Sequence, residues 1–255
     1  MSHGYISCTA CKEFFRKQDW EYGFERWGHG EPVQLINNPA DWGSENPTYR
    51  LLGFSKGDTQ NKAMAEERKG RTSFESIPFK GMRKRFPWLF RGLGLRELPN
   101  PDGLFLSSEK EFQSGSVIKC SISARKADGK YSYKLQDIID ADGPSGGKVR
   151  KILSTCIERH LSQEPPGRTF VIFGLDEGLI AWCRNAFAEA YSSLRQVKPT
   201  TYRNEDLSWV HVAHPSGNQT DPQYQRWCDG HTTTAKVVWA RDELAYRRGR
   251  NGGYL

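Results

Sequence analysis

The sequence predicts an α/β fold, with a doubly wound, mostly parallel sheet and helices on both faces. Apolar runs typical of buried strands alternate along the chain with segments whose apolar residues recur at helical spacing. This alternation favours parallel pairing, because a crossover helix returns the chain to the end of the sheet that it left. A chain of 255 residues is long enough for one substantial core, so we expect residues 1–255 to form a single domain.

The individual elements follow from the same patterns. Predicted strands cover residues 49–52, 116–122, 169–174 and 208–213, and predicted helices cover residues 59–69, 149–161 and 177–194. Residues 12–48 are rich in aromatic and charged side chains and contain several Pro, Gly and Asn, which indicates a short helix and then an irregular connection. The polar, Gly-containing stretch 121–148 is interpreted as a surface insertion, and residues 247–253 as a basic tail.

The charge balance of the chain favours a polyanionic partner. There are 37 Lys and Arg residues against 30 Asp and Glu, which gives a formal net charge of +7. The apolar runs are too short to span a bilayer, and residues 1–8 lack the pattern of a signal peptide. We therefore expect a cytoplasmic protein without a membrane segment, and we expect it to be a monomer.

One loop has the composition of a ligand-binding turn. The apolar run 49–52 leads into a polar loop bounded by Gly53 and Gly57, and a helical pattern begins near Thr59. In an open parallel sheet such a loop lies where ligand crevices form, and its glycines let the backbone approach a ligand closely. Lys56 adds a positive charge, and the first amides of the helix can hold an anion. The alternative is an ordinary turn between a strand and a helix.

The cysteines indicate reduced thiols or metal ligands rather than disulfides, because the chain is expected to be cytoplasmic. Cys8 and Cys11 have the two-residue gap that lets two thiolates reach one metal or cluster. Alone, this pair leaves zinc, an iron-sulfur cluster, a redox pair and inert thiols open. Two further ligands are available among the remaining cysteines, which are Cys120, Cys156, Cys183 and Cys228.

A basic and aromatic segment covers residues 78–86 and includes Phe79, Lys80 and Arg83. Such a mixture can stack a base beside phosphate contacts. The alternative is the solvated start of a helix whose phenylalanines belong to the core.

Taken together, these segments resemble the uracil-DNA glycosylase superfamily, in particular its iron-sulfur branch, family four. The matching order is Cys-x-x-Cys, a strand with a Gly-bounded loop, Pro-Phe-x-Gly, a strand ending in Val-Ile-Lys-Cys, a helix with a Cys, a strand ending in Gly and a strand with His-Pro-Ser. The resemblance covers residues 8–219. It implies DNA as the partner and a four-iron, four-sulfur (4Fe-4S) cluster held by Cys8, Cys11, Cys120 and Cys156. Cys183 and Cys228 have no counterpart, and the gap between Cys120 and Cys156 is longer than is usual in the family.

The resemblance also implies a reaction, namely hydrolysis of the N-glycosidic bond of a nucleotide flipped out of DNA. The transition state is negative on the departing base and positive on the sugar, so it needs a donor to the base oxygen and a group that positions water. His214 matches the donor; the alternative is a packed or capping histidine. Phe79 matches the aromatic on which the base stacks. The expected base pocket comprises Phe54, Phe79, Ser116 and Asn218, and the expected DNA contacts are Lys56, Lys80, Arg83, Ser216 and Gln219.

Two departures from the family bear on the chemistry. Where relatives read Gly-Gln-Asp-Pro, Gly-Glu-Ala-Pro or Gly-x-Asn-Pro, this chain has a loop with Ser55 and no carboxylate or Asn at the usual water-activating positions. Asp58, just after the loop, is the candidate catalytic carboxylate, and its alternative role is to cap or complement the helix N-terminus. Ser55, within the loop, is the other candidate catalytic residue there. Ser116 stands where relatives place the Asn that pairs with uracil, which removes that recognition and enlarges the pocket.

Three functions follow from this pattern. The first is a DNA glycosylase acting on a modified pyrimidine, with glucosylated hydroxymethylcytosine of phage DNA as the candidate, because the pattern looks similar to bacterial anti-phage glycosylases. The second is a uracil-DNA glycosylase of base excision repair that reads its base through Asn218 or backbone amides. The third is a non-catalytic DNA-binding relative. We favour the first.

Overall fold

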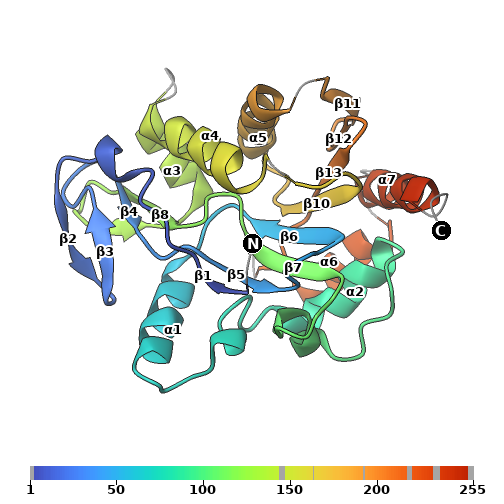
Figure 1. The fold of residues 1–255 in the computed structure, drawn as a ribbon, viewed down its shortest axis with the longest axis horizontal. Helices are drawn as coiled ribbons and strands as arrows, with labels where there is room; N and C mark the ends of the chain where they lie inside the picture. Colours follow the sequence, from blue (N-terminus) through green and yellow to red (C-terminus); the bar gives the residue numbers. More distant parts are fainter. Residues whose placement is uncertain are drawn as a thin grey trace.

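The computed structural model describes residues 3–143, 147–162, 164–191, 193–216, 220–231 and 236–251. Within these ranges, a mixed eight-stranded sheet is covered by helices on both faces, and a five-stranded antiparallel sheet lies beside it (Figure 1). The predicted α/β fold class is confirmed. The parallel part is the centre of the large sheet, and antiparallel strands extend it at both edges.

The large sheet contains three of the four predicted strands, those at 49–52, 169–174 and 208–213. In spatial order its strands are β1 (Gly4–Tyr5), β5 (Ala40–Gly43), β7 (Phe112–Ser116), β6 (Tyr49–Gly53), β10 (Arg168–Phe173), β13 (Leu207–Val212), β12 (Thr201–Arg203) and β11 (Arg195–Lys198). The four central strands, β7, β6, β10 and β13, pair in parallel. All four therefore end at the same edge of the sheet, where ligand crevices form in folds of this class.

The smaller sheet corrects three expectations. Its strands are β2 (Gln18–Glu21), β3 (Phe24–Trp27), β4 (Val33–Ile36), β8 (Ser121–Arg125) and β9 (Tyr131–Ser132). The irregular connection predicted over 12–48 is wrong, because only a short 3₁₀ helix precedes a set of strands there. The strand predicted over 116–122 is wrong, because residues 117–120 form a bend between β7 and β8, and only Ser116 and residues 121–122 lie in strands. The surface insertion predicted over 121–148 is wrong for its first part, because β8 is buried except at Arg125.

The described residues form seven α-helices, of which the sequence patterns predicted three, at 59–69, 149–161 and 177–194. They are α1 (Asp58–Arg68), α2 (Phe86–Gly92), α3 (Leu135–Asp142), α4 (Lys148–His160), α5 (Glu177–Ala190), α6 (Asp221–Cys228) and α7 (Lys236–Asn251), with short 3₁₀ helices at Lys12–Phe14, Phe74–Ser76, Arg83–Arg85 and Pro101–Phe105. Side chains define two of the starts: Asp176 accepts a hydrogen bond from the Leu179 amide at α5, and Thr220 and Gln223 form a capping box at α6.

The core has two halves, one on each face of the large sheet. Alternation along the central strands divides the apolar side chains: Leu52 and Ile172 pack beneath α3, α4 and α5, whereas Leu51 and Val171 pack against α1, α2, α6 and α7 (Figure 1). Both faces of the parallel strands are therefore buried, which explains why these strands have nearly continuous apolar sequences.

The basic tail predicted over 247–253 is wrong in the part that the structure describes, because α7 continues to Asn251. Arg247 is buried, and its guanidinium donates hydrogen bonds to Ser208 Oγ at 2.6 Å and to the carbonyl oxygen of Glu205 at 2.7 Å. Arg247 therefore anchors α7 to β13.

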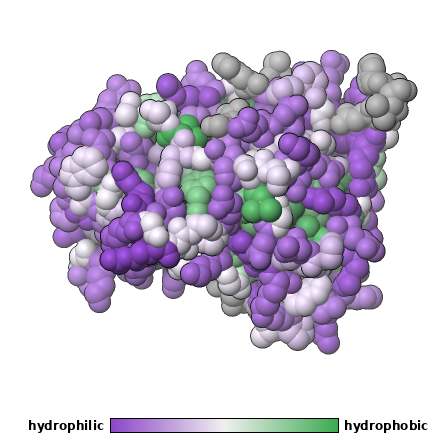
Figure 2. Space-filling model, turned by 60° about the horizontal axis from the view of Figure 1, so that its bottom comes forward, coloured by the Kyte–Doolittle hydropathy of each residue, from purple (hydrophilic) through white to green (hydrophobic). Residues whose placement is uncertain are grey.

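Among the described residues, the structure contains no helix with the length and apolar character of a membrane span. The face in Figure 2 is mainly polar, with a few apolar patches near its middle.

Two helical glycines give a test of this packing. A Cβ atom added at Gly92 in α2 would collide with the backbone of Cys228 in α6, whereas a Cβ at Gly249 in α7 meets nothing within 4 Å. Gly92→Ala should therefore lower the free energy of unfolding by about 1–3 kcal/mol through overpacking. Gly249→Ala should leave it unchanged or raise it by up to about 1 kcal/mol through helix propensity. Denaturant unfolding measures both, and equal effects would contradict the α2–α6 contact.

Candidate functional site

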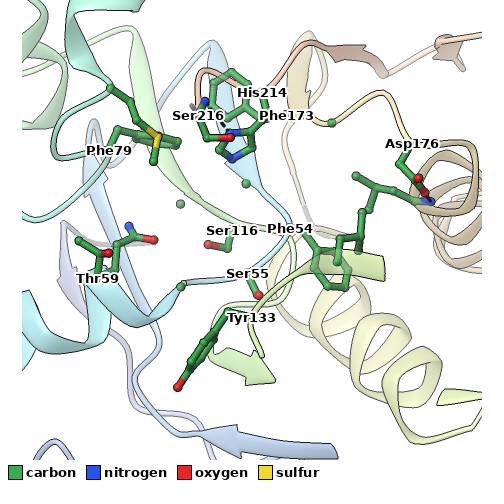
Figure 3. Close-up of a pocket in the computed structure, with 18 of the residues that line it drawn as sticks. Phe54, Ser55, Thr59, Phe79, Ser116, Tyr133, Phe173, Asp176, His214 and Ser216 are labelled. Carbon is green, nitrogen blue, oxygen red and sulfur yellow. Dashed lines mark hydrogen bonds between the residues drawn. The ribbon is translucent and has the colours of Figure 1, made fainter. Parts of the chain in front are cut away.

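A cavity of about 610 Å³ lies at the carboxyl ends of the parallel strands. Its walls come from the last two residues of β7, from the ends of β6 and β10 and the residues that follow them, from the residues that follow β13, and from segments 79–82 and 133–135. Figure 3 shows Phe79 and His214 on one side, Tyr133 on the other and Ser116 between them. The cavity thus gathers segments that are far apart in the sequence.

His214 carries its proton on the nitrogen that is free for a ligand. The Ser216 amide donates a hydrogen bond to His214 Nδ1 at 3.0 Å, so in the neutral ring Nδ1 accepts and Nε2 bears the hydrogen. Burial lowers the pKa of His214 to about 4, which keeps the ring neutral at physiological pH. His214 is therefore a neutral donor at the cavity wall.

Arg85 fixes the loop that carries His214, and the sequence analysis did not single it out. Its guanidinium donates to the carbonyl oxygens of Pro215 at 3.1 Å and Ser216 at 2.7 Å, and it pairs with Asp221 at 2.9 Å. The partners of Arg85 lie about 130 residues later in the sequence, so the sequence could not predict these contacts. The basic character of residues 78–86 was the available signal.

Phe79 forms an aromatic wall of the cavity. Its ring meets Phe86 and Phe173 edge to face, with centroid separations of 5.2 and 5.3 Å. The backbone of Phe79 has φ 52°, in the left-handed region that is uncommon for residues other than glycine. Phe79 belongs to the core, as one alternative from the sequence expected, and it also lines the cavity, where its role in base stacking stays a prediction.

Asp58 lines the cavity from the first turn of α1. It is not the helix cap, since the cap position is Gly57 and no side-chain capping bond is made there. Instead, its oxygens contact the Tyr22 hydroxyl at 2.8 Å and the Lys62 ammonium at 2.6 Å. Burial raises the pKa of Asp58, but the hydrogen bonds from Lys62 and Tyr22 outweigh it and leave the pKa below its usual value. Asp58 is therefore ionised at neutral pH.

Three further residues predicted for the site also line the cavity: Phe54, Ser55 and Ser116. Ser116 ends β7 directly opposite Gly53 of β6. Phe54 packs against Trp182 of α5, with ring centroids 6.4 Å apart.

Two of the predicted DNA contacts have internal partners. Lys56 is fully buried, and its ammonium donates to the Lys119 carbonyl oxygen and lies 5.8 Å from the centre of the Trp42 ring. The prediction that Lys56 faces DNA is therefore wrong, because the loop turns this side chain inward. Arg83 is mostly enclosed, with its guanidinium bound to Asp102 at 2.7 Å and to the Pro78 carbonyl oxygen at 2.9 Å.

Lys80 and Ser216 remain at the cavity, and Lys80 is exposed to solvent. Asn218 and Gln219 lie outside the described residues.

The four cysteines that the resemblance selects come close together. A hydrogen bond with Cys156 and burial raise the pKa of Cys11, and the nearby Cys120 and Cys8 add to the rise. Two buried ammonium groups lie beside them, because Lys119 and Lys56 both help to lower the pKa of Cys156, although its hydrogen bond with Cys11 is the larger cause. Among the described residues, no three His, Cys, Asp or Glu side chains are placed to hold a single metal ion.

Two tyrosines next to the strands of the smaller sheet, one lining the cavity and one contacting Asp58 from outside it, were missed by sequence reasoning. Tyr133 lines the cavity just after β9, and Tyr22, at the turn between β2 and β3, contacts Asp58. Burial raises the pKa of Tyr133 to about 12. For Tyr22, the available signal was the aromatic content of residues 12–48, but this content does not indicate where any side chain points.

Comparisons with solved structures give a weak likeness in fold. Searches against protein-family models and against curated proteins found no match. The chain is similar in fold to a solved structure described as wild-type SMUG2 from Pedobacter heparinus, with 12% identity, a TM-score of 0.38, and coverage of 81% of this chain and 77% of that one.

The tautomer of His214 gives a prediction that is independent of any activity. Nitrogen NMR should show an imidazole that titrates near pH 4 and carries its proton on Nε2 at neutral pH, because Nδ1 accepts from the Ser216 amide. The His214→Gln variant assigns the signal. A midpoint near the ordinary histidine value of about 6.5, or a proton on Nδ1, would contradict this geometry.

Proposed function

We propose that the protein is a DNA glycosylase. The observation that carries this proposal is the combination, in one cavity, of an aromatic wall at Phe79, a neutral donor at His214 and an ionised carboxylate at Asp58. The cavity lies at the carboxyl ends of the parallel strands, as ligand sites in open α/β sheets do. A flipped base needs a stacking surface, and its release needs charge stabilisation at both ends of the breaking bond.

The reaction that we propose is hydrolysis of the N-glycosidic bond. As the bond breaks, its electron pair moves to the base, and the Nε2 hydrogen of His214 stabilises the negative charge that develops on a base oxygen. Asp58 offsets the positive charge of the sugar and orients the water whose oxygen bonds to the sugar carbon. The water's proton is passed on to solvent or to the departing base. Lys80 and Ser216, at the cavity wall, are the candidate phosphate contacts.

We infer that the base is a modified cytosine, with glucosylated hydroxymethylcytosine of phage DNA as the candidate, and that the activity serves anti-phage defence. Two features support a bulky base. The volume of about 610 Å³ falls within the range of roughly 300–1,000 Å³ typical of sites for drug-sized ligands. A Cβ at Gly57, which lines the cavity, would meet nothing within 4 Å, so the lining is open there.

The function is tested by base release from duplexes that differ at one position. Purified protein is incubated with DNA containing glucosylated hydroxymethylcytosine, uracil or cytosine, and the released base and alkali-labile sites are measured. We expect release of the modified base, and His214→Ala should slow it by about 10²–10³-fold through loss of one preorganised donor. His29→Ala, at an exposed histidine outside the cavity lining, is the matched control.

Two outcomes would overturn parts of this proposal. Efficient release of uracil without release of any modified cytosine would contradict the role in defence and support a uracil-DNA glycosylase of base excision repair. If the protein binds DNA but releases none of the bases tested, it is a non-catalytic DNA-binding protein and the glycosylase proposal is wrong.

We also propose that Cys8, Cys11, Cys120 and Cys156 hold a 4Fe-4S cluster with a structural role. The proximity of the thiols supports this, as do the buried ammonium groups of Lys56 and Lys119, whose charge offsets that of thiolates. A cluster would tie the N-terminal segment to α4 and to the connection between β7 and β8.

The metal content tests the cluster. Protein purified without oxygen should be brown and contain iron and sulfide, and Cys156→Ser should lose most of both. Cys183→Ser is the matched control, because Cys183 is also a buried helical cysteine but lies outside the proposed ligand set. Stoichiometric zinc without iron, or equal loss in both variants, would contradict the cluster.

A further inference from the structure

The turn between β2 and β3 contains a tyrosine in an unfavourable backbone conformation. Tyr22 and Gly23 form the two-residue turn, since Glu21 pairs with Phe24, and their φ angles are 54° and 75°. Turns of this kind favour Asn, Asp or Gly at both positions, because positive φ is sterically disfavoured for residues with larger side chains. A strained backbone conformation persists only where the surrounding structure enforces it, so the contacts of the Tyr22 side chain indicate what it contributes.

The side chain of Tyr22 crosses from the smaller sheet to the cavity carboxylate. Its hydroxyl donates to Asp58 Oδ1 at 2.8 Å, while Lys62, one turn further along α1, contacts Oδ2 at 2.6 Å. Both carboxylate oxygens are thus held from outside the cavity, by groups on two different elements. The Asp58 side chain is 40% exposed, so without these partners it would be free to rotate towards solvent.

We propose that Tyr22 is a positioning residue that acts through Asp58, and that the β2–β3 turn keeps its strained tyrosine in order to hold this carboxylate toward the cavity. The smaller sheet then has a role in the reaction as well as in the fold. The effect on base release rests on the proposed function, whereas the hold of Tyr22 on Asp58 does not.

The charged and titratable groups around Asp58 give the direction of the expected effect. Lys62 faces it from α1, Tyr22 from the turn and Tyr133 from the segment after β9; Glu21 lies near both tyrosines and is paired with Arg26 at 3.0 Å. Burial raises the pKa of Asp58, and hydrogen bonds from Lys62 and Tyr22 lower it. Removal of the Tyr22 hydroxyl should therefore raise that pKa, so that Asp58 is protonated at a higher pH.

The experiment compares Tyr22→Phe and Tyr22→Asn with the control Tyr5→Phe. Tyr5 donates from its hydroxyl to Glu67 at 2.7 Å, near the other end of α1, so the control removes a similar bond away from the cavity. Three quantities are measured: the pKa of Asp58 by carbon NMR of the carboxyl groups, the thermal stability, and the pH profile of base release.

Tyr22→Phe should raise the Asp58 pKa, move the acid limb of base release to higher pH and slow release by roughly 10- to 100-fold at neutral pH, as expected for a misplaced catalytic group. Tyr22→Asn should slow release as much while leaving stability equal or higher, because Asn suits the turn. Tyr5→Phe should change neither the pKa nor the release rate.

Two results would overturn the inference. One is an unchanged Asp58 pKa in Tyr22→Phe. The other is a Tyr22→Asn variant in which stability and release fall together, since Tyr22 would then affect release only through the stability of the fold. A third result separates the two proposals. If the parent protein releases no base but the Asp58 pKa still rises in Tyr22→Phe, the proposed function is wrong and the contact between Tyr22 and Asp58 is supported.

Discussion

The site depends on the register of four parallel strands. Gly53 of β6 lies opposite Ser116 of β7, and Phe173 of β10 lies opposite Val212 of β13, so the strands end nearly level. The loops that follow therefore open at one edge of the sheet, and each brings a polar or aromatic group within a few residues of its strand end. A shift in pairing would separate these groups, because the strands are buried on both faces and their side chains alternate between two cores.

Buried charge pairs link the strands of the large sheet to neighbouring segments. Asp41 of β5 pairs with Lys119 at 2.7 Å, and Arg50 of β6 pairs with Glu164 at 2.7 Å. Unpaired charges at this depth would be costly, so the folded state needs both partners of each pair. Gly115 has no side chain where Asp41 approaches, and a Cβ there would collide with the Asp41 carboxylate. The same region holds Lys56, so the cavity loop and the cysteine region are linked through buried cations.

The sequence predicted the parts of the fold that have long, regular patterns. The helix at 149–161 and the strand at 169–174 needed only apolar periodicity, and the structure has α4 and β10 within one residue of these bounds. The strands of the smaller sheet are short and separated by connections that contain Gly and Pro, so local pattern could not distinguish them from loops.

At the site, sequence position identified which residues lie near the cavity but not where their side chains point. His214, Phe79 and Ser116 all line it. Lys56 turns inward and Asp58 is held by Tyr22, a residue 36 positions earlier in the chain. Both outcomes depend on tertiary contacts.

The most direct test of the account is a structure of the protein with DNA that contains an uncleavable analogue of the modified nucleotide. The account predicts that the flipped base lies in the cavity against Phe79, with a base oxygen within hydrogen-bond distance of His214 Nε2. A complex in which DNA binds another face and the cavity stays empty, or in which Nε2 points away from the base, would contradict it.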